Sequence, residues 1–183
     1  MSGAVAGLAL ALAVTWSAST MAESAGGPVE LPPAKFKGLR SGVVRTLEAM
    51  HCRVPQRVGD NSPHNVVKGE FLRKGSTAWA VLCWHDGRES ILVFDAQGDK
   101  PVVSLGDDDN SGPTGEWGGS KHDDYTGTIG RATPKYILQH DEWYGNIPPA
   151  PKIEHDGINA GSDKGSVIFY FHDGKWRTLS GAD

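Results

Sequence analysis

Residues 65–94 read NVVKGEFLRKGSTAWAVLCWHDGRESILVF, and this stretch decides the fold. Within it, residues 77–84 (TAWAVLCW) are apolar at odd and even positions alike, and residues 90–94 (SILVF) repeat the pattern. A strand that is apolar on both faces is covered on both sides. The Asp-Gly pair between the two runs favours a tight turn. The stretch therefore predicts a central antiparallel hairpin that is buried on both faces.

The segment before this hairpin carries the pattern of an amphipathic helix. Apolar residues recur at spacings of three and four along one face, at Phe36, Leu39, Val43, Leu47 and Met50. Pro33 suits a first helical position, and Pro55 ends the pattern. Gly38 and Gly42 weaken a helix by about 1 kcal/mol each, so we expect this helix to depend on packing.

The segment after the hairpin predicts further short strands. Residues 129–138 suit a strand or a short helix, and residues 165–178 form a clear hairpin pattern around Asp173-Gly174. The fold class expected is α+β, with the N-terminal amphipathic helix docked on a mainly antiparallel β-sheet. A chain of 183 residues fits one such domain, which we place at 33–183 after a short linker over 23–32.

The first 22 residues predict export. They contain no charged side chain, and a short apolar run over residues 5–14 precedes Thr20-Met21-Ala22, which has the small-x-small form of a signal-peptidase site. We therefore expect a signal peptide over 1–22 and an extracytoplasmic protein, periplasmic or secreted. An uncleaved N-terminal anchor is the alternative, although the apolar run is short for a membrane span.

The two cysteines, Cys52 and Cys83, predict a disulfide. An exported chain meets an oxidising compartment, and an even cysteine count favours pairing. Such a bond would tether the end of the N-terminal helix to the central hairpin. The alternative is a reactive thiol, because His51 and His85 lie close to the cysteines in sequence.

Composition excludes several classes of protein. Apolar residues make up 38% of the chain and charged residues 22%, with a net charge of −4. These values are ordinary for a globular protein, and they argue against a disordered polyelectrolyte and against a basic nucleic-acid binder. No uncharged apolar run in the body is long enough to span a membrane, so none is expected after signal cleavage.

An acidic loop carries the candidate metal site. Asp107, Asp109 and Ser111 stand at positions 1, 3 and 5 of a loop with Gly112 at position 6, which is how an oxygen-ligand calcium loop begins. The twelfth position is Gly118 instead of glutamate, so a short calcium turn or a solvated acidic loop are the two interpretations. Residues 154–159 (EHDGIN) alternate oxygen groups around a glycine and form a weaker second candidate.

Histidine precedes aspartate at five places, beginning at residues 85, 122, 140, 155 and 172. Both side chains serve as metal ligands and acid–base groups, so an extracytoplasmic metal-dependent hydrolase is one hypothesis. The pairs are expected at strand ends and turns, and Asp-Gly turn formation explains two of them without catalysis. No known catalytic motif appears, so we assign no catalytic residue and no cofactor other than the possible calcium.

The tryptophans bear on a binding role. Trp79 lies inside an apolar strand and is expected in the core, whereas Trp117 and Trp143 stand in polar, glycine-bearing stretches. Exposed tryptophan beside Asp and Asn suits a sugar- or peptide-binding face, but a core or loop-anchoring role is the favoured interpretation.

Residues 65–94 also resemble a block found in a set of uncharacterised secreted bacterial proteins, and residues 155–183 and the CRVPQ segment at 52–56 are similar to other parts of these proteins. Gly69-Glu70-Phe71 followed by Ala78-Trp79-Ala80-Val81 resembles the FG-GAP strand motif of propeller blades. Ala78 stands where that motif has aspartate. The resemblance implies export and a β-rich core, and it implies no activity.

These observations favour a non-enzymatic binding or envelope-associated module whose ligand is an unknown protein or carbohydrate. The metal-dependent hydrolase and a structural or assembly component are the alternatives.

Overall fold

A computed structural model describes residues 29–57, 60, 62–85, 88–106, 127–162 and 165–181. The expected signal peptide over 1–22, most of the expected linker and the acidic loop lie outside these residues. Glu30–Leu31, at the end of the expected linker, forms strand β1 and pairs with β2 (Val54–Pro55).

The described part of the chain is β-rich, with three antiparallel sheets and two α-helices. The first four-stranded sheet has the order β3-β4-β5-β6, and the second has the order β10-β9-β8-β7. The strands of the first sheet are β3 (Val66–Gly69), β4 (Ala78–His85), β5 (Arg88–Phe94) and β6 (Val103–Leu105). Those of the second are β7 (Thr128–Ala132), β8 (Gly157–Ser162), β9 (Gly165–His172) and β10 (Lys175–Ser180).

The central hairpin predicted from residues 77–94 is present as β4 and β5. Trp79 pairs with Phe94, and His85 pairs with Arg88 across the turn. Alternate residues of β4 enter two different buried clusters, because successive side chains of a strand point to opposite faces. Ala80 and Leu82 join a cluster that includes Ile158 and Phe169 of the second sheet, so the main core lies between the two sheets.

The other face of β4 enters a second cluster, which includes α1 (Ser41–Ala49). Its members are Phe36, Leu39, Val43, Leu47, Cys52, Val54, Trp79, Val81, Cys83, Leu92 and Phe94. The predicted disulfide is present: Cys52 and Cys83 are bonded, their Cα atoms lie 5.4 Å apart, and both are buried. The bond joins the residues that follow α1 to the centre of the first sheet.

The helix at this end is shorter than the apolar pattern predicted. Pro33–Lys35 forms a separate 3-10 turn (η1), and α1 begins only at Ser41. Gly38 lies in the break, and its carbonyl accepts a hydrogen bond from the indole Nε1–H of Trp79 at 2.9 Å. A continuous helix would use that carbonyl within its own ladder, so packing on Trp79 competes with helix formation here.

The second sheet carries the other helix, α2 (Pro134–Tyr144), on its outer face. Ile137 of α2 is buried with Ile168, Tyr170 and Leu179 of the sheet. The predicted C-terminal hairpin is present as β9 and β10, and Asp173 and Gly174 adopt φ values of 49° and 74°. These positive values are those that a tight primed turn requires of its two central residues. Residues 129–138 contain a strand and the first turns of a helix.

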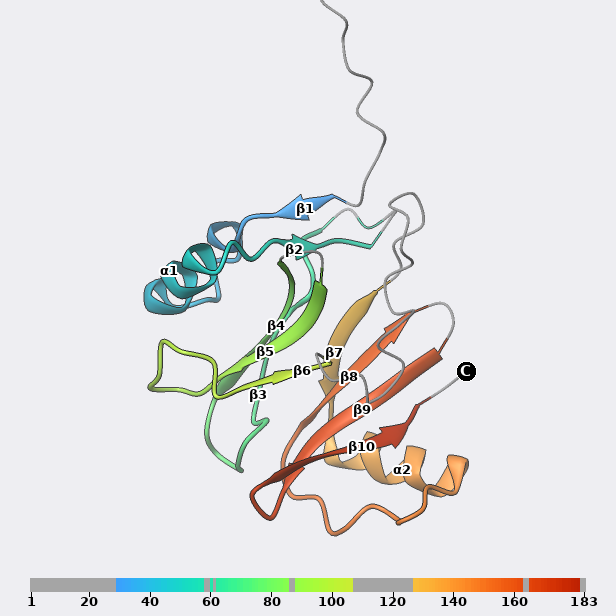
Figure 1. The fold of residues 1–183 in the computed structure, drawn as a ribbon. Helices are drawn as coiled ribbons and strands as arrows, with labels where there is room; N and C mark the ends of the chain where they lie inside the picture. The colour runs from blue at the N-terminus through green and yellow to red at the C-terminus, as the bar shows by residue number, and fades with distance from the viewer. Residues whose placement is uncertain are drawn as a thin grey trace, which may run out of the picture.

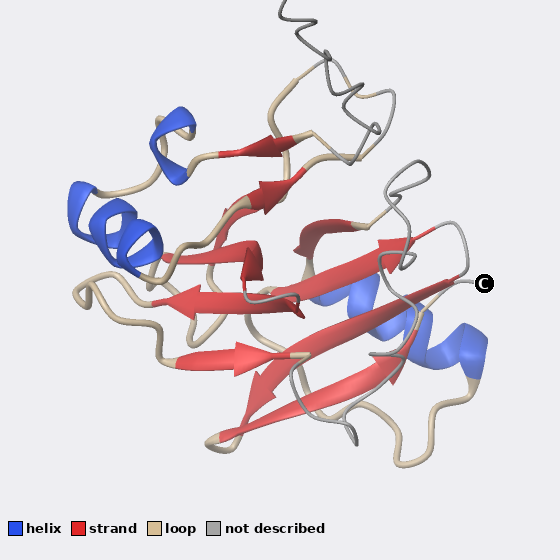
Figure 2. Cartoon of the chain, turned by 45° about the horizontal axis from the view of Figure 1, so that its top comes forward, coloured by secondary structure: helices blue, strands red, loops and turns tan. Residues whose placement is uncertain are grey.

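The two four-stranded sheets therefore lie face to face, and α1 and α2 lie on opposite sides of the molecule (Figures 1 and 2). The edge strands β3 and β7 come close to each other where the sheets meet, although no backbone ladder joins them. Polar side chains gather where these two edges meet.

Candidate functional site

Asp107, Asp109 and Ser111, the predicted calcium ligands, lie outside the described residues. The structure describes only the two ends of their loop, Gly106 after β6 and Gly127 before β7. The carbonyl of Gly127 accepts a hydrogen bond from the side-chain amide of Asn65. The acidic loop therefore ends at a polar cluster, which we call the polar junction (Asn65, Gln56 and His64). Asn65 and Gln56 are buried, and His64 is partly exposed.

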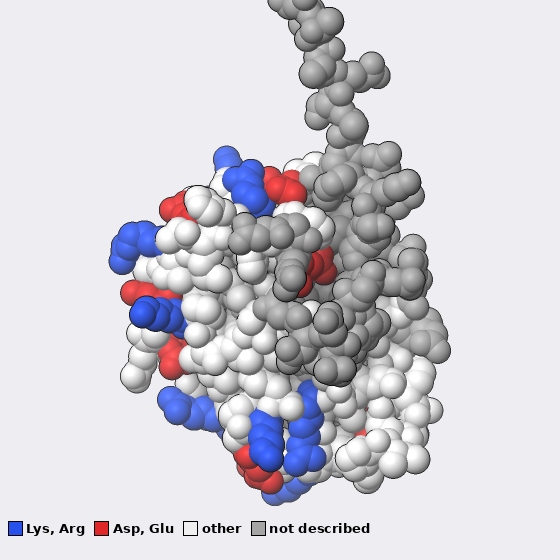
Figure 3. Space-filling view, viewed as in Figure 1, with Lys and Arg blue, Asp and Glu red and all other residues white. Residues whose placement is uncertain are grey.

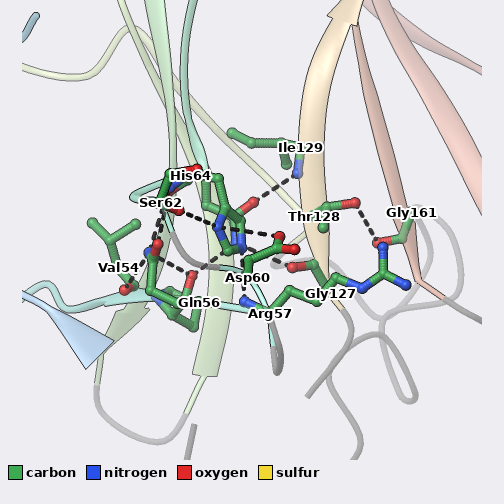
Figure 4. Close-up of polar contacts among 12 residues, drawn as sticks. Val54, Gln56, Arg57, Asp60, Ser62, His64, Gly127, Thr128, Ile129 and Gly161 are labelled. Atoms are coloured by element: carbon green, nitrogen blue, oxygen red, sulfur yellow. Dashed lines mark hydrogen bonds and ion pairs between the residues drawn. The ribbon is translucent and has the colours of Figure 1, made fainter. Parts of the chain in front are cut away.

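Asn65 is the centre of the polar junction and is 1% exposed. Its Nδ2 donates to the carbonyls of Pro55 at 2.7 Å and Gly127 at 3.0 Å, and its Oδ1 accepts from the backbone N–H of Ile129 at 2.9 Å. Its backbone has φ 70°, in the left-handed region where asparagine is enriched. One side chain thus joins the β2 segment to the start of β7. Figure 4 labels Val54 and Gln56 on the β2 side, and Gly127 and Ile129 on the β7 side.

Gln56 and His64 close the loop that precedes Asn65. The Oε1 of Gln56 accepts from the backbone N–H of His64 at 2.9 Å, and its Nε2 donates to the carbonyl of His64 at 3.1 Å. The imidazole Nε2 of His64 accepts from the backbone N–H of Arg57 at 2.7 Å. Its Nδ1 lies 3.1 Å from the carbonyl oxygen of Ser62 and 3.5 Å from Oδ2 of Asp60.

Sequence reasoning did not single out any residue of the polar junction. The available signal was the run of turn-forming residues at 61–65 (NSPHN) just before a strand. That signal predicts a loop, and it does not show that the last asparagine turns inward.

The His-Asp pairs do not assemble into a metal centre within the described ranges, where no group of three or more His, Cys, Asp or Glu residues could hold an ion. His85 ends β4, His155 precedes β8, and His172 ends β9 beside Asp173. The expectation that all pairs sit at strand ends and turns was wrong for His140-Asp141, which lies within α2. The pair at 122–123 is not among the described residues.

The weaker metal candidate at residues 154–159 has its carboxylates engaged elsewhere. Oδ2 of Asp156 accepts from the backbone N–H of Glu70 at 3.0 Å and lies 3.9 Å from a guanidinium nitrogen of Arg131. Glu154 pairs with Lys152 at 2.9 Å, and this hydrogen bond holds the pKa of the Glu154 carboxyl below its usual value. Asp156, which directly precedes β8, therefore links the end of β3 to β7, and Asn65 links the start of β3 to the start of β7.

The tryptophan predictions can be compared with the structure at two positions. Trp79 is buried, as predicted, at 8% exposure. Trp143, near the end of α2, is 66% exposed, so it does not anchor the core. Trp117 lies outside the described residues.

Trp143 belongs to an exposed apolar segment at the end of α2, which we call the α2 apolar surface. Its members are Trp143, Tyr144, Ile147, Pro148 and Pro149. Tyr144 is 41% and Ile147 is 96% exposed, and residues 143–151 carry no charged side chain. In the space-filling view, charged side chains gather over α1, over the first sheet and around the tip of the β9–β10 hairpin, while the lower right of the molecule is nearly free of them (Figure 3).

The base of the α2 apolar surface is a group of packed rings. The ring of His140 is buried and packs against the rings of Tyr136, Trp143 and Tyr144, with centroid distances of 3.9, 5.5 and 5.6 Å. Burial raises the pKa of the Tyr136 hydroxyl, and the neighbouring Tyr144 raises it further. Oδ1 of Asn146 accepts from the backbone N–H of Ser180 at 2.9 Å, which ties the segment after α2 to β10.

Neither helix in the described ranges has the length and apolar content that a bilayer crossing requires. Comparison of the chain with protein families, with curated proteins and with solved structures finds no match.

Proposed function

We propose that the protein is an exported, non-enzymatic binding module whose contact surface is the α2 apolar surface. The exposure of Trp143, Tyr144 and Ile147 side by side in the chain carries this proposal. Large apolar side chains gathered on a surface mark interaction sites, and tryptophan and tyrosine are the residues that most often dominate binding energy. The buried His140 ring packs against Trp143 and Tyr144, so these two side chains are held ready for contact, with little side-chain entropy to lose.

The partner proposed is another protein, in preference to a carbohydrate. Sugar recognition combines an aromatic face with directed hydrogen bonds, and few polar groups are available here. Asn146 uses its Oδ1 on Ser180, and its Nδ2 is buried. The exposed aliphatic side chain of Ile147 and the two prolines after it suit the apolar centre of a protein interface.

The export part of the proposal rests on the N-terminal sequence and on the disulfide. The apolar run over residues 5–14 and Thr20-Met21-Ala22 predict processing after Ala22. A buried disulfide suits an oxidising compartment. The proposal includes membership of the uncharacterised secreted family that residues 65–94 resemble, and docking of α1 on the first sheet through Val43 and Leu47. Intact mass of the protein recovered outside the cytoplasm measures the processing.

Site-specific photocrosslinking in the producing cell tests the contact surface. A photoreactive residue replaces Ile147, and the control position is Val102, an apolar residue that is 49% exposed in the segment before β6. We expect one discrete protein adduct from position 147 and none from position 102. The adduct should disappear when Trp143→Ala is added and persist when Val102→Ser is added, with thermal melts showing that both variants fold.

Other outcomes separate the alternatives. Equal adducts from both positions, or an adduct that ignores Trp143→Ala, would reject the surface. A change in tryptophan fluorescence when the wild type is titrated with neutral oligosaccharides, absent from Trp143→Ala, would point to a carbohydrate ligand. Metal-dependent hydrolysis of ester or phosphoester probes by the wild type would favour the hydrolase hypothesis instead.

A further inference from the structure

Strand β10 is an edge of the second sheet, and alternate residues of it present backbone groups on the open side. Among the described strands, none pairs with β10 on the side away from β9 (Figures 1 and 2). The N–H of Gly181 bonds to the carbonyl of Ser166, and bonded pairs alternate along an antiparallel ladder. The N–H and carbonyl groups of Trp176 and Thr178 therefore point away from β9.

The open part of this edge is positively charged. Trp176 packs against the core between the sheets, so its neighbours Lys175 and Arg177 lie on the other face of the strand, toward α2. Burial raises the pKa of the Tyr170 hydroxyl, and the charges of Arg177 and Asp141 act on it in opposite directions. Even so, neither Lys175 nor Arg177 forms an ion pair with another residue of the described ranges.

The charges favour an acidic segment over a second copy of the chain. Antiparallel pairing of two β10 strands through Trp176 and Thr178 would place Arg177 of one copy opposite a cation of the other. Like charges directly opposite each other in a ladder are destabilising. A register that also used Ser180 would need the N–H that already donates to Asn146. A strand with acidic side chains two positions apart brings opposite charges together instead.

We propose that β10 binds an extended acidic segment of another protein, which adds to the second sheet as an antiparallel strand. Its backbone pairs with Trp176 and Thr178, and its acidic side chains lie opposite Lys175 and Arg177. In this mode of recognition the main-chain bonds give affinity and alternate side chains give specificity. The proposal does not rest on the α2 apolar surface, so it stands whether or not that surface binds a protein.

Amide hydrogen exchange of the wild-type protein with the acetylated and amidated peptide TEVEVET tests the pairing. In the free protein, the outward amides of Trp176 and Thr178 should exchange fast, and the amides of Arg177 and Leu179 should be protected by β9. Millimolar peptide should slow exchange at the two outward amides by about tenfold. No slowing would overturn the proposal. Protection that rises with protein concentration in the absence of peptide would show pairing of copies and would also overturn it.

Two modified peptides and one variant separate backbone pairing from charge attraction. In an antiparallel addition the valines of the peptide turn their N–H groups toward β10, and the glutamates turn theirs away. N-methylation of the valines should abolish binding, and N-methylation of the glutamates should preserve it. Thr178→Pro removes an outward donor at an edge position where proline is tolerated, and it should weaken binding about tenfold. Equal binding of the two modified peptides, or full binding by Thr178→Pro, would reject strand addition.

A matched pair of double variants tests the cations. Lys175→Gln with Arg177→Gln should weaken peptide binding about fivefold, the effect of two cross-strand ion pairs. Lys35→Gln with Lys37→Gln changes the net charge equally at exposed positions near η1 and should leave the affinity unchanged. Trp143→Ala should also leave it unchanged, which distinguishes this edge from the α2 apolar surface. Equal losses in the two double variants would show general charge attraction and overturn the proposal.

Discussion

The side chain of Asn65 takes the place of a backbone residue opposite Thr128. Its Oδ1 accepts from the N–H of Ile129 at 2.9 Å and its Nδ2 donates to the carbonyl of Gly127 at 3.0 Å. A residue in a parallel ladder bonds in this way to the residues before and after its opposite neighbour. The amide thus makes one ladder step between β3 and β7, two edge strands that belong to different sheets.

Removal of this amide should destabilise the whole domain. Asn65→Gly keeps the positive φ permitted, so the loss measured is that of the side-chain bonds to Pro55, Gly127 and Ile129. With about 1 kcal/mol for each bond, we expect the free energy of unfolding to fall by about 3 kcal/mol in urea titrations. A loss below about 1 kcal/mol would show that water replaces the amide at no cost.

Two glycines of the second sheet should respond oppositely to alanine. A Cβ on Gly157 would lie 2.7 Å from the carbonyl oxygen of Phe169 and 3.1 Å from Cδ1 of Ile137, whereas one on Gly130 meets nothing within 4 Å. Gly157→Ala must therefore shift backbone, and we expect a loss of about 2 kcal/mol or more. Gly130→Ala, the matched control, should be neutral or stabilising by up to about 1 kcal/mol. Thermal melts that rank the two variants in reverse would contradict this packing.

The disulfide should contribute substantially to stability. Its loop spans 31 positions, for which the chain-entropy model gives roughly 3–4 kcal/mol. Cys52→Ala with Cys83→Ala should lower the free energy of unfolding by about 2–5 kcal/mol, the range for small secreted domains. Peptide mapping without reductant checks the pairing, and free alkylation of both thiols in the native, oxidised protein would refute it.

Acid should weaken the turn after β5. Hydrogen bonds from the backbone N–H groups of Gly98 and Gln97 hold the pKa of the Asp95 carboxyl below its usual value, and the charge of Arg40 adds to this. A lowered folded-state pKa means that the contribution is present above the unfolded-state pKa and is lost as the pH falls through the folded-state value. Asp95→Asn should therefore flatten the stability profile below about pH 4. A profile that keeps the wild-type slope there would exclude Asp95 as a cause.

Calcium binding by the acidic loop remains a prediction. Asp107, Asp109 and Ser111 with local carbonyls supply about half of a calcium shell, so affinity should be weak, of order 10⁻⁴–10⁻³ M. At tenfold the dissociation constant, stabilisation would be about 1.4 kcal/mol, measured as a shift in thermal melts at fixed ionic strength. Asp107→Ala with Asp109→Ala should abolish the shift, and Glu48→Ala with Glu142→Ala, two exposed carboxylates, should preserve it. Identical melting temperatures with and without calcium would reject the calcium site and support the interpretation of a solvated acidic loop.

Strand faces could be predicted from the sequence because alternation acts locally. The opposite faces of Trp79 and Ala80, and of Phe169 and Ile168, follow from a period of two and from the burial that apolar side chains require. The Asp173-Gly174 turn was predictable for the same reason, since a backbone angle limits the residues that can occupy it.

The bonds of Asn65 to β7 could not be predicted, because its partners there are distant in the chain. Nothing near Asn65 in sequence indicates that Gly127 and Ile129, more than sixty positions away, will present an unpaired carbonyl and N–H to it. The helix break at Gly38 was missed for a similar reason. The periodicity of side chains does not show that the indole N–H of Trp79 will donate a hydrogen bond to the Gly38 carbonyl. The exposure of Trp143 depended likewise on which face of α2 the second sheet covers.

The bond between Asn146 and Ser180 bears on how copies of this protein behave when crowded together. The N–H of Gly181 bonds to the carbonyl of Ser166, so the neighbouring Ser180 turns its own N–H away from β9, toward the open side of the sheet. An outward N–H at the margin of a sheet is what an incoming strand needs in order to extend it into a fibre. The Oδ1 of Asn146 accepts a hydrogen bond from this N–H, so a shorter stretch of β10 is open to pairing with another strand. Asn146 is thus expected to slow polymerisation.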